Sequence, residues 1–366
     1  MRVALITYST KPRGGVVHTL NLAEALAAEG ADVTVWSLAR QGDVGFFRAV
    51  DTSVAVRLLD FPDRRDEDVT GRIVRSIDTL RTHFTPQDFD IVHAQDCISA
   101  NAVGTCIRTI HHLDEFTTPI LAECHEKAVV APYARICVSA AVAAEVESGW
   151  GLRPTVIPNG VRADRFIAAS TAAEDQQRWR ERLGRYVLAV GGIEPRKGTL
   201  DLVEAYHCLR QRHPDIGLVI AGGETLFDYR DYRAEFDRRC RELSLDPVIL
   251  GAVPDDDLPS LVAASEAFAF PSIKEGFGLA AMEALAAGRP VVTRDLPVLR
   301  EVFGDTVRYA RDIAGFAAAL AASIGDTARV EAGRALALST TWEAAARAHL
   351  DFYSCHPAPP AAAGGG

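Results

Sequence analysis

Short apolar runs alternate with amphipathic segments along the first half of the chain. Residues 3–7 and 33–36 are strand-like runs, and the apolar positions of residues 17–29 between them repeat with the period of a helix. Three further runs predict strands at residues 90–93, 120–124 and 136–139. Buried strands that are separated by helices predict a parallel sheet built from βαβ units.

The same alternation starts again after residue 160. Pro158, Asn159 and Gly160 have the chemistry of a turn, and predicted strands follow at residues 186–190, 218–221, 248–250, 267–270 and 290–293. Because 366 residues are too many for one ordinary core, we predict two α/β domains, residues 1–160 and 161–341. The Pro-, Ala- and Gly-rich residues 357–366 predict a disordered tail.

Composition and charge exclude some classes of function. A formal net charge of −10 argues against a nucleic-acid partner, because nucleic acids bind surfaces rich in Lys and Arg, but a small cationic pocket stays possible. The seven cysteines contain no Cys-x-x-Cys pair, which favours reduced thiols and argues against a structural metal site. The apolar runs are too short for a signal peptide or a transmembrane segment, so we predict a cytoplasmic protein.

Residues 271–283 form the first candidate site. They follow a predicted strand and open an apolar helix, which is where ligands bind in open α/β sheets. Gly276 and Gly278 allow a ligand to approach the backbone and the N–H groups of the first helical turn. Glu275 precedes the helix and Glu283 lies two turns into it, so the two residues are about 12 Å apart along the helix axis. This spacing is too wide for an acid/base pair on one bond and suits two carboxylates that bind opposite ends of an extended ligand. The alternative is that these residues only form a turn and a helix start.

Residues 191–198 form the second candidate site, a glycine-flanked loop between a predicted strand and a helix over residues 199–212. Lys197 stands beside the start of this helix, where a point charge, backbone N–H groups and the helix dipole together suit a diphosphate. Arg196 either contributes to the same site or faces solvent.

Together these segments resemble the GT-B glycosyltransferases of family 4, a large retaining group. The resemblance rests on Gly-Gly-Ile-Glu-Pro-Arg-Lys-Gly at 191–198, on Pro-Ser-x-x-Glu-Gly-Phe-Gly-Leu at 271–279 with its Glu-x7-Glu spacing, and on Gly14-Gly15 and Pro-Asn-Gly. It covers almost the whole chain. It implies two Rossmann-like, doubly wound parallel-sheet domains that face each other across a cleft, with acceptor-side residues 1–160 and donor-side residues 161–341. It also implies a terminal helix, residues 342–353, that packs back on the first domain.

The resemblance implies a role for individual residues. Lys197 would bind the donor diphosphate, Glu275 would hold the donor sugar, and His125, expected at the end of a strand, would face that sugar as a third catalytic residue. His93 and Asp96 are secondary candidates for contact with the acceptor. Many family members have an arginine where this chain has Gly192, so compensation by Arg196 is a hypothesis. The residues implied in donor binding are Gly15, Gly191, Gly192, Arg196, Lys197, Gly276, Phe277, Gly278, Leu279 and Glu283, the last of them at the ribose.

The sequence therefore predicts a retaining hexosyltransferase that uses a UDP-, GDP- or ADP-sugar and a sugar or other small hydroxyl acceptor. We expect no metal or other cofactor to be required, because Lys197 and helix dipoles can neutralise the departing diphosphate. Two alternatives remain open. One is a catalytically silent nucleotide-sugar-binding protein of the same fold; the other is a dinucleotide-dependent oxidoreductase, which is disfavoured because no Gly-x-Gly-x-x-Gly follows the first strand. The donor, the acceptor and the oligomeric state are not specified by the sequence.

Overall fold

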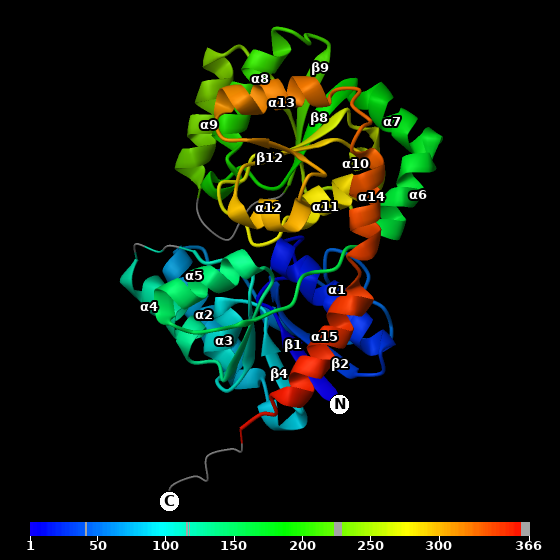
Figure 1. Ribbon diagram of the computed structural model, residues 1–366. Helices are drawn as coiled ribbons and strands as arrows, with labels where there is room; N and C mark the ends of the chain where they lie inside the picture. Colours follow the sequence, from blue (N-terminus) through cyan, green and yellow to red (C-terminus); the bar gives the residue numbers. More distant parts are fainter. Residues whose placement is uncertain (41, 115, 117, 223–228, 360–366) are drawn as a thin grey trace, which may run out of the picture. The chain divides into compact units, whose positions relative to one another are not determined.

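The computed structural model describes residues 1–40, 42–114, 116, 118–222 and 229–359, and it divides into two compact units. Unit 1 comprises Met1–Gly160 and Trp342–Gly366, and unit 2 comprises Val161–Thr341. Each unit is a parallel sheet with helices packed on it (Figure 1). Within the described residues, no helix is both long enough and apolar enough to cross a membrane. Most of the predicted disordered tail, residues 360–366, lies outside the described part of the chain.

The sheet of unit 1 has seven parallel strands in the order β3-β2-β1-β4-β5-β6-β7. The central strands β1, β4 and β5 are buried on both faces, as a covered parallel sheet requires. The strand order reverses between β1 and β4, which places a ligand-binding edge at the loops that follow these two strands. The strands are β1 (Arg2–Ile6), β2 (Asp32–Arg40), β3 (Ala55–Phe61), β4 (Ile91–Ala94), β5 (Ile107–Ile110), β6 (Ala134–Cys137) and β7 (Thr155–Val156).

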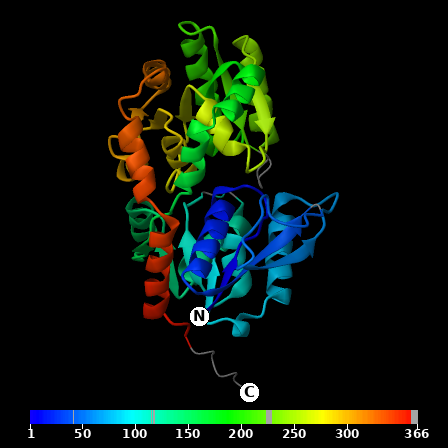
Figure 2. The same cartoon turned by 90° about the vertical axis from the view of Figure 1, so that its right-hand side faces the viewer.

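Six α-helices accompany this sheet in the described part of unit 1, and the last of them comes from the far end of the chain. This helix, α15, lies beside α1 in both views (Figures 1 and 2) and buries Trp342, His349, Phe352 and Tyr353. Spacings of three, four and seven residues put these four side chains on one face. The helices are α1 (Gly14–Ala28), α2 (Val69–His83), α3 (Cys97–Val103), α4 (Pro119–Val130), α5 (Ala140–Trp150) and α15 (Trp342–Cys355).

The sheet of unit 2 has six parallel strands in the order β10-β9-β8-β11-β12-β13. Its order reverses between β8 and β11, which are paired neighbours. The strands are β8 (Arg185–Val190), β9 (Ile216–Ala221), β10 (Val248–Gly251), β11 (Ala267–Phe270), β12 (Val291–Arg294) and β13 (Arg308–Ala310).

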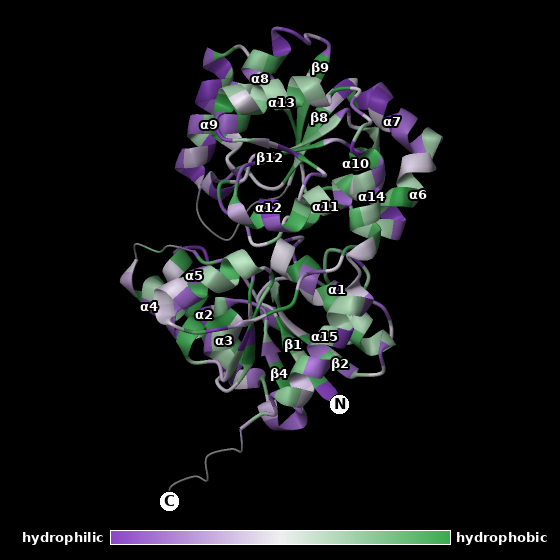
Figure 3. Cartoon of the chain, viewed as in Figure 1, coloured by the Kyte–Doolittle hydropathy of each residue, from purple (hydrophilic) through white to green (hydrophobic). Residues whose placement is uncertain are grey.

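The helices of unit 2 cover the sheet with their apolar sides. One core cluster joins the sheet to α8, α9 and α13, and the charge-rich α9 buries only Phe236 and Cys240 and is largely hydrophilic in Figure 3. The helices are α6 (Ala163–Thr171), α7 (Ala173–Leu183), α8 (Thr199–Arg210), α9 (Arg230–Glu242), α10 (Leu258–Ala264), α11 (Leu279–Ala286), α12 (Pro297–Phe303), α13 (Ile313–Ser323) and α14 (Val330–Ser339).

One predicted strand is wrong. Residues 120–124 belong to helix α4, not to a strand. Pro119 stands at the first position of this helix, where proline is well tolerated, and the buried positions Leu121, His125, Ala128 and Val129 follow the helical period. The strand that occupies this place in the sheet is β5, which ends ten residues earlier in the chain than the predicted one began. The other strand predictions are confirmed, while β3, β5, β7 and β13 were not predicted.

Candidate functional site

Unit 2 brings the two predicted site segments to neighbouring strands. Residues 191–198 follow β8 and residues 271–278 follow β11, so both loops leave the carboxyl edge of the sheet where the strand order reverses. This is the edge at which doubly wound sheets bind ligands.

Backbone contacts hold the two loops together. The Ile273 N–H donates to the Arg196 carbonyl at 2.9 Å. Gly198 has a φ of +62°, and a Cβ atom at this position would lie 2.4 Å from the carbonyl oxygen of Pro271. Since a side chain would collide with that carbonyl, the close approach of the loops depends on glycine.

Two cations converge on one carboxylate between these loops. The Oε1 atom of Glu275 accepts a hydrogen bond from Lys197 Nζ at 2.5 Å and one from the Arg196 guanidinium at 3.2 Å. Arg196 also pairs with Glu194 at 3.1 Å, so it turns towards the site rather than towards solvent. Burial acts to raise the pKa of the Glu275 carboxyl, but the charges of Lys197 and Arg196 outweigh burial and lower that pKa to about 2. The site is therefore charged at neutral pH.

Helix α11 starts directly at this site. Its N-cap residue Gly278 has a φ of +99°, and a Cβ atom there would lie 3.1 Å from the ring of Phe303. No side chain caps the helix and no acidic residue stands in its first turn. The start of α11 therefore presents positive potential next to Lys197, which suits an anion. Gly276 and Phe277 are buried in the same loop and Leu279 opens the helix.

Glu283 has a different environment on the second turn of α11. Its carboxyl makes no side-chain hydrogen bond or ion pair within the described residues. Burial and the nearby Asp255 carboxylate raise the pKa of Glu283 to about 8, against the opposing charge of Arg165, which itself pairs with Asp255 at 2.8 Å. A partly buried carboxyl in this state is suited to a polar ligand group.

The structure contradicts the predicted position of His125. This residue lies in the middle of α4, buried at 7% exposure, with its ring 5.5 Å from the Phe116 ring and 6.5 Å from the Trp150 indole. The prediction depended on a strand at residues 120–124, and without that strand His125 does not stand at the carboxyl edge of the sheet. It packs instead between α4 and its neighbours.

His111 is the histidine that follows a strand at the carboxyl edge of unit 1. It comes directly after β5, and its ring is edge-on to that of His18 with 4.6 Å between the centroids. A Cβ atom on Gly15, in the first turn of α1, would lie 3.6 Å from the His111 ring. The Nε2 atom of His111 is shielded and has no hydrogen-bond partner in the part of the chain that the structure describes. Burial, with the neighbouring His112 and Arg108, lowers the pKa of His111 to about 3, so its imidazole is neutral at pH 7.

Sequence reasoning missed His111 because Arg108 and Thr109 interrupt the apolar run of β5. The available signal was position: His111 stands immediately after the short stretch 107–110, before a Pro-initiated helix. Gly222 was also missed. A Cβ atom there would lie 2.2 Å from the Gly191 carbonyl, so this glycine allows β9 to end tightly against the Gly191-Gly192 peptide.

Neither secondary candidate of unit 1 is placed to contact an acceptor freely. His93 is fully buried, and its two ring nitrogens are occupied by the Tyr353 hydroxyl and Thr109 Oγ1, each at 2.7 Å. Its predicted acceptor contact is therefore wrong. The Asp96 carboxylate caps α3 through Ser99 and accepts from the Tyr8 N–H at 3.0 Å, so it organises the loops after β1 and β4.

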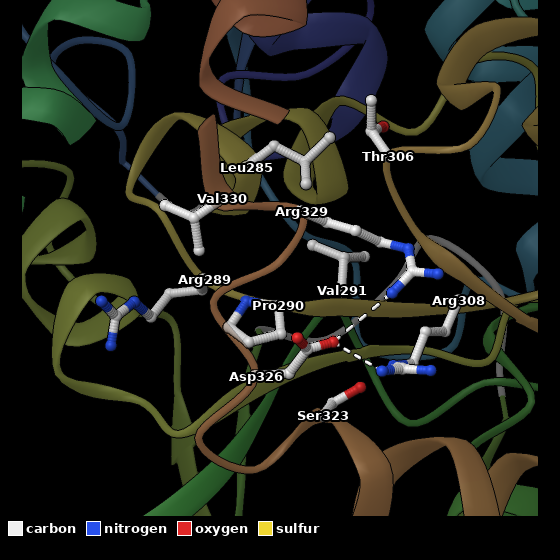
Figure 4. A pocket seen from close by; sticks show the side chains of 10 residues that line it. All are labelled: Leu285, Arg289, Pro290, Val291, Thr306, Arg308, Ser323, Asp326, Arg329 and Val330. Carbon is white, nitrogen blue, oxygen red and sulfur yellow. Dashed lines mark hydrogen bonds and ion pairs between the residues drawn. The ribbon is translucent and has the colours of Figure 1, made fainter. Parts of the chain in front are cut away.

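A hollow in unit 2 lies away from these loops. It is lined by residues at the amino ends of β12 and β13, including Pro290 and Arg308, and Figure 4 shows Asp326 between Arg308 and Arg329. These pairs are 2.6 Å and 3.4 Å long. Arg308 and Arg329 are thus both engaged by Asp326, and Arg289 donates to the Ser265 carbonyl at 3.2 Å. Among the described residues, no group of three or more His, Cys, Asp or Glu side chains is placed to hold a metal ion.

Comparison with known proteins places both halves of the chain in one class. Residues 172–326 match the family model described as glycosyl transferases group 1, and residues 12–165 match the model described as glycosyltransferase family 4. The phosphatidyl-myo-inositol mannosyltransferase of Mycobacterium tuberculosis is 30% identical over 83% of this chain and 80% of its own length. The O-antigen chain mannosyltransferase B of Escherichia coli is 36% identical over 43% of this chain, which spans only 42% of that relative. The structure of Anabaena HepE in complex with UDP-glucose has a TM-score of 0.75 at 18% identity and covers 97% of this chain and 100% of that one.

Proposed function

The chain belongs to the family 4 glycosyltransferases of GT-B fold, and from this premise we propose that it moves a hexosyl group from a nucleoside diphosphate sugar to a hydroxyl acceptor with retention of configuration. One observation carries the proposal. Lys197, Arg196 and Glu275 meet at the reversal point of the unit 2 sheet, beside the uncapped start of α11. A cation, a helix start and a carboxylate in one place suit a diphosphate joined to a sugar.

Each residue has a defined role in this proposal. Lys197 and the N–H groups at the start of α11 hold the diphosphate, while the Glu275 carboxylate, ionised at neutral pH, accepts hydrogen bonds from sugar hydroxyls. Glu283, without a partner in the described residues, takes the ribose hydroxyls. His111 takes the role for which His125 was predicted, because it is the histidine at the end of a sheet strand.

The proposed reaction breaks the bond between C1 of the sugar and the diphosphate oxygen. The acceptor oxygen forms the new bond to C1 on the same face, and its proton passes to the departing phosphate. Lys197 and the α11 dipole stabilise the charge that develops on the leaving group, which is electrostatic preorganisation. Since Lys197 and the α11 dipole supply the compensating positive charge, we propose that neither a metal nor another cofactor is needed. Transfer should therefore continue in EDTA.

The donor is identified by thermal stabilisation. A ligand that binds only the folded protein raises its melting temperature, so UDP, GDP and ADP with their glucose and mannose derivatives form the test panel. Mannose and glucose are included because the matched relatives are named as mannosyltransferases and HepE was solved with UDP-glucose. We expect one base to stabilise the protein clearly. No stabilisation by any nucleotide would contradict the proposal.

Variants then test the site itself. Lys197→Ala and Glu275→Ala should each lower transfer by at least about 100-fold, because each removes a charge-assisted contact to the transition state. Lys274→Ala is the matched control, since it removes a neighbouring lysine that makes no side-chain ion pair in the described residues. Equal rates for all three variants would reject the site.

Donor hydrolysis separates an enzyme from a silent nucleotide-sugar-binding protein. A glycosyltransferase slowly transfers sugar to water when no acceptor is present, whereas a silent binder releases none. Slow release that Lys197→Ala abolishes would support the enzyme.

A further inference from the structure

Three arginines of unit 1 stand at the carboxyl edge of its sheet, where the neighbouring strands β1, β2 and β3 end. Arg13 precedes α1, Arg40 ends β2, and Arg72 lies near the start of α2, so three separate elements supply them. They are close enough to repel: burial and the charges of Arg72 and Arg13 lower the pKa of the Arg40 guanidinium, against the nearby Asp63 and Tyr8. Like charges gathered in this way are unfavourable unless an anion joins them.

Two of these arginines lack a carboxylate partner within the described residues. Arg13 donates to the Tyr8 hydroxyl at 2.7 Å, and its Nε atom is shielded and unbonded. The Arg40 side chain makes no hydrogen bond or ion pair with the described residues and only approaches the Phe61 ring, at 5.9 Å. Both side chains are partly exposed, so a ligand can reach them.

Other cations nearby are neutralised by the protein itself. Arg48 pairs with Glu24 at 2.6 Å, Arg75 with Glu67 at 2.5 Å, and Lys11 with Asp43 at 2.7 Å. In a chain with a net charge of −10, carboxylates are abundant. The pairing of these neighbours makes the unneutralised Arg13 and Arg40 a local exception.

The acidic groups near Arg13, Arg40 and Arg72 do not neutralise the charge of this arginine cluster. Asp63 is exposed and forms no ion pair with Arg40 within the described residues. The Asp96 carboxylate accepts hydrogen bonds from Ser99 and from the Tyr8 N–H. Its pKa is raised by burial and lowered by the charge of Arg108, not by one of the three arginines. The start of α1 adds positive potential, because its first turn contains no acidic residue and no side chain caps it.

We propose that Arg13, Arg40 and Arg72 form a subsite for a phosphate group carried by the acceptor. Guanidinium groups bind phosphate through paired N–H donors, and three of them from different directions enclose one phosphate. The inference rests on the proposed function, since it names the chemical class of the acceptor for that transfer. The phosphate belongs either to a soluble phosphorylated sugar or to a lipid headgroup.

Binding of inorganic phosphate to the full chain tests the subsite directly, by calorimetry at low ionic strength. Arg40→Gln and Arg72→Gln should each weaken phosphate binding by about 10- to 100-fold, the range for losing a hydrogen bond to a charged group. Arg57→Gln, an exposed arginine on β3, removes the same charge outside the cluster and should bind as the parent does. Because Arg40 is repelled in the free protein, Arg40→Gln should keep or raise the melting temperature. Equal phosphate affinity in Arg40→Gln, Arg72→Gln and Arg57→Gln would overturn the proposal.

Transfer assays assign the source of the phosphate. With the donor found above, the enzyme is offered a hexose, its 6-phosphate, and vesicles of phosphatidylcholine with or without phosphatidic acid. Preference for the 6-phosphate over the hexose, or sedimentation with the acidic vesicles only, supports the subsite if Arg40→Gln abolishes that preference or that sedimentation. The absence of both effects in the parent protein overturns the proposal.

Donor hydrolysis keeps the two proposals distinguishable. Arg40→Gln should hydrolyse donor at the parental rate, because the donor residues of unit 2 are untouched. Absence of hydrolysis in the parent would reject the proposed function alone, since phosphate binding is measured without donor.

Discussion

At the scale of single residues, one short segment contains two glutamates in opposite charge states. Glu275 is held ionised by Lys197 and Arg196, with a pKa of about 2, while burial and Asp255 raise the pKa of Glu283 to about 8. The same side chain thus serves two purposes because its neighbours differ. The Glu-x7-Glu spacing reveals the pair, but the charge states depend on residues from other elements, Lys197 on one side and Asp255 on the other.

The proposed contact of Glu283 with the ribose should make nucleotide binding depend on pH. Ribose hydroxyls donate to a carboxylate, so the protein must release the Glu283 proton when it binds nucleotide below pH 8. The dissociation constant should therefore rise about fivefold as the pH falls from 8 to 7, and only slightly between pH 9 and 8.5. Calorimetric titration across pH 6.5–9 measures this. In Glu283→Gln the dissociation constant should vary little with pH, and any variation that remains comes from the nucleotide phosphates. A wild-type dissociation constant that varies as little as that of the variant would contradict the proposed role of Glu283 at the ribose.

Loss of the His111 side chain should slow transfer strongly. His111→Ala should lower kcat by about 100-fold or more with the fold intact, the range of a general acid–base or positioning contact. His125→Leu keeps an apolar group in its pocket on α4 and should retain near-normal kcat per folded molecule. Measuring kcat and melting temperature for both variants checks the assignment. A larger loss of kcat in His125→Leu than in His111→Ala would restore the original prediction.

At the scale of elements, the proposed donor site depends on the close contact between the loops after β8 and β11. Gly198→Ala places a Cβ atom where the Pro271 carbonyl lies and requires a left-handed conformation that alanine disfavours. We expect it to destabilise the protein by about 2 kcal/mol and to weaken nucleotide binding at least tenfold. Gly217→Ala is the control, because its Cβ would meet only the Arg185 carbonyl at an ordinary 3.6 Å. Denaturant unfolding and calorimetry give both quantities, and identical values for the two variants would show that the loops do not need this close contact.

Element assignment from the sequence succeeded where apolar runs were continuous. The strands β8, β9 and β11 are such runs, and the loops that follow β8 and β11 contain the motifs of the candidate site. It failed at β5, because Arg108 and Thr109 hide a buried strand: Arg108 is only 4% exposed, and Thr109 bonds to His93. It failed again at residues 120–124, where an apolar run belongs to a helix that Pro119 initiates. Short apolar runs do not distinguish a strand from a buried helix, since tertiary packing decides.

At the scale of the whole molecule, the two units differ in what their cores contain. In the described part of the chain, every histidine with a lowered pKa lies in unit 1. These side chains join the sheet to α1 and α15: the His349 ring is 5.8 Å from that of His93 and 6.3 Å from that of His18. Such an arrangement spans residues that are far apart in the sequence, so no local pattern predicts it.

Unit 1 should therefore be the part of the molecule that acid unfolds first. Burial lowers the pKa of His349 to about 4 and that of His111 to about 3, against about 6.5 in an unfolded chain. The unfolded state consequently binds more protons below pH 6.5, so the stability due to neutral histidines is complete above pH 6.5 and is lost as the pH falls towards 4. Each histidine lowers the free energy of unfolding by about 1.4 kcal/mol per pH unit. The two together therefore lower it by about 5 kcal/mol by pH 4.5, which is comparable with the stability of a domain.

Hydrogen exchange at pH 7 and pH 5, corrected for the intrinsic pH dependence of exchange, separates the two units peptide by peptide. Peptides of α1 and α15 should lose protection at pH 5 while those of α8 and α11 retain it. His349→Leu removes one titrating group and should shift the loss to lower pH, since the remaining histidines must then supply the destabilisation. Equal loss in both units, or no shift in this variant, would mean that the buried histidines do not control the acid stability of unit 1.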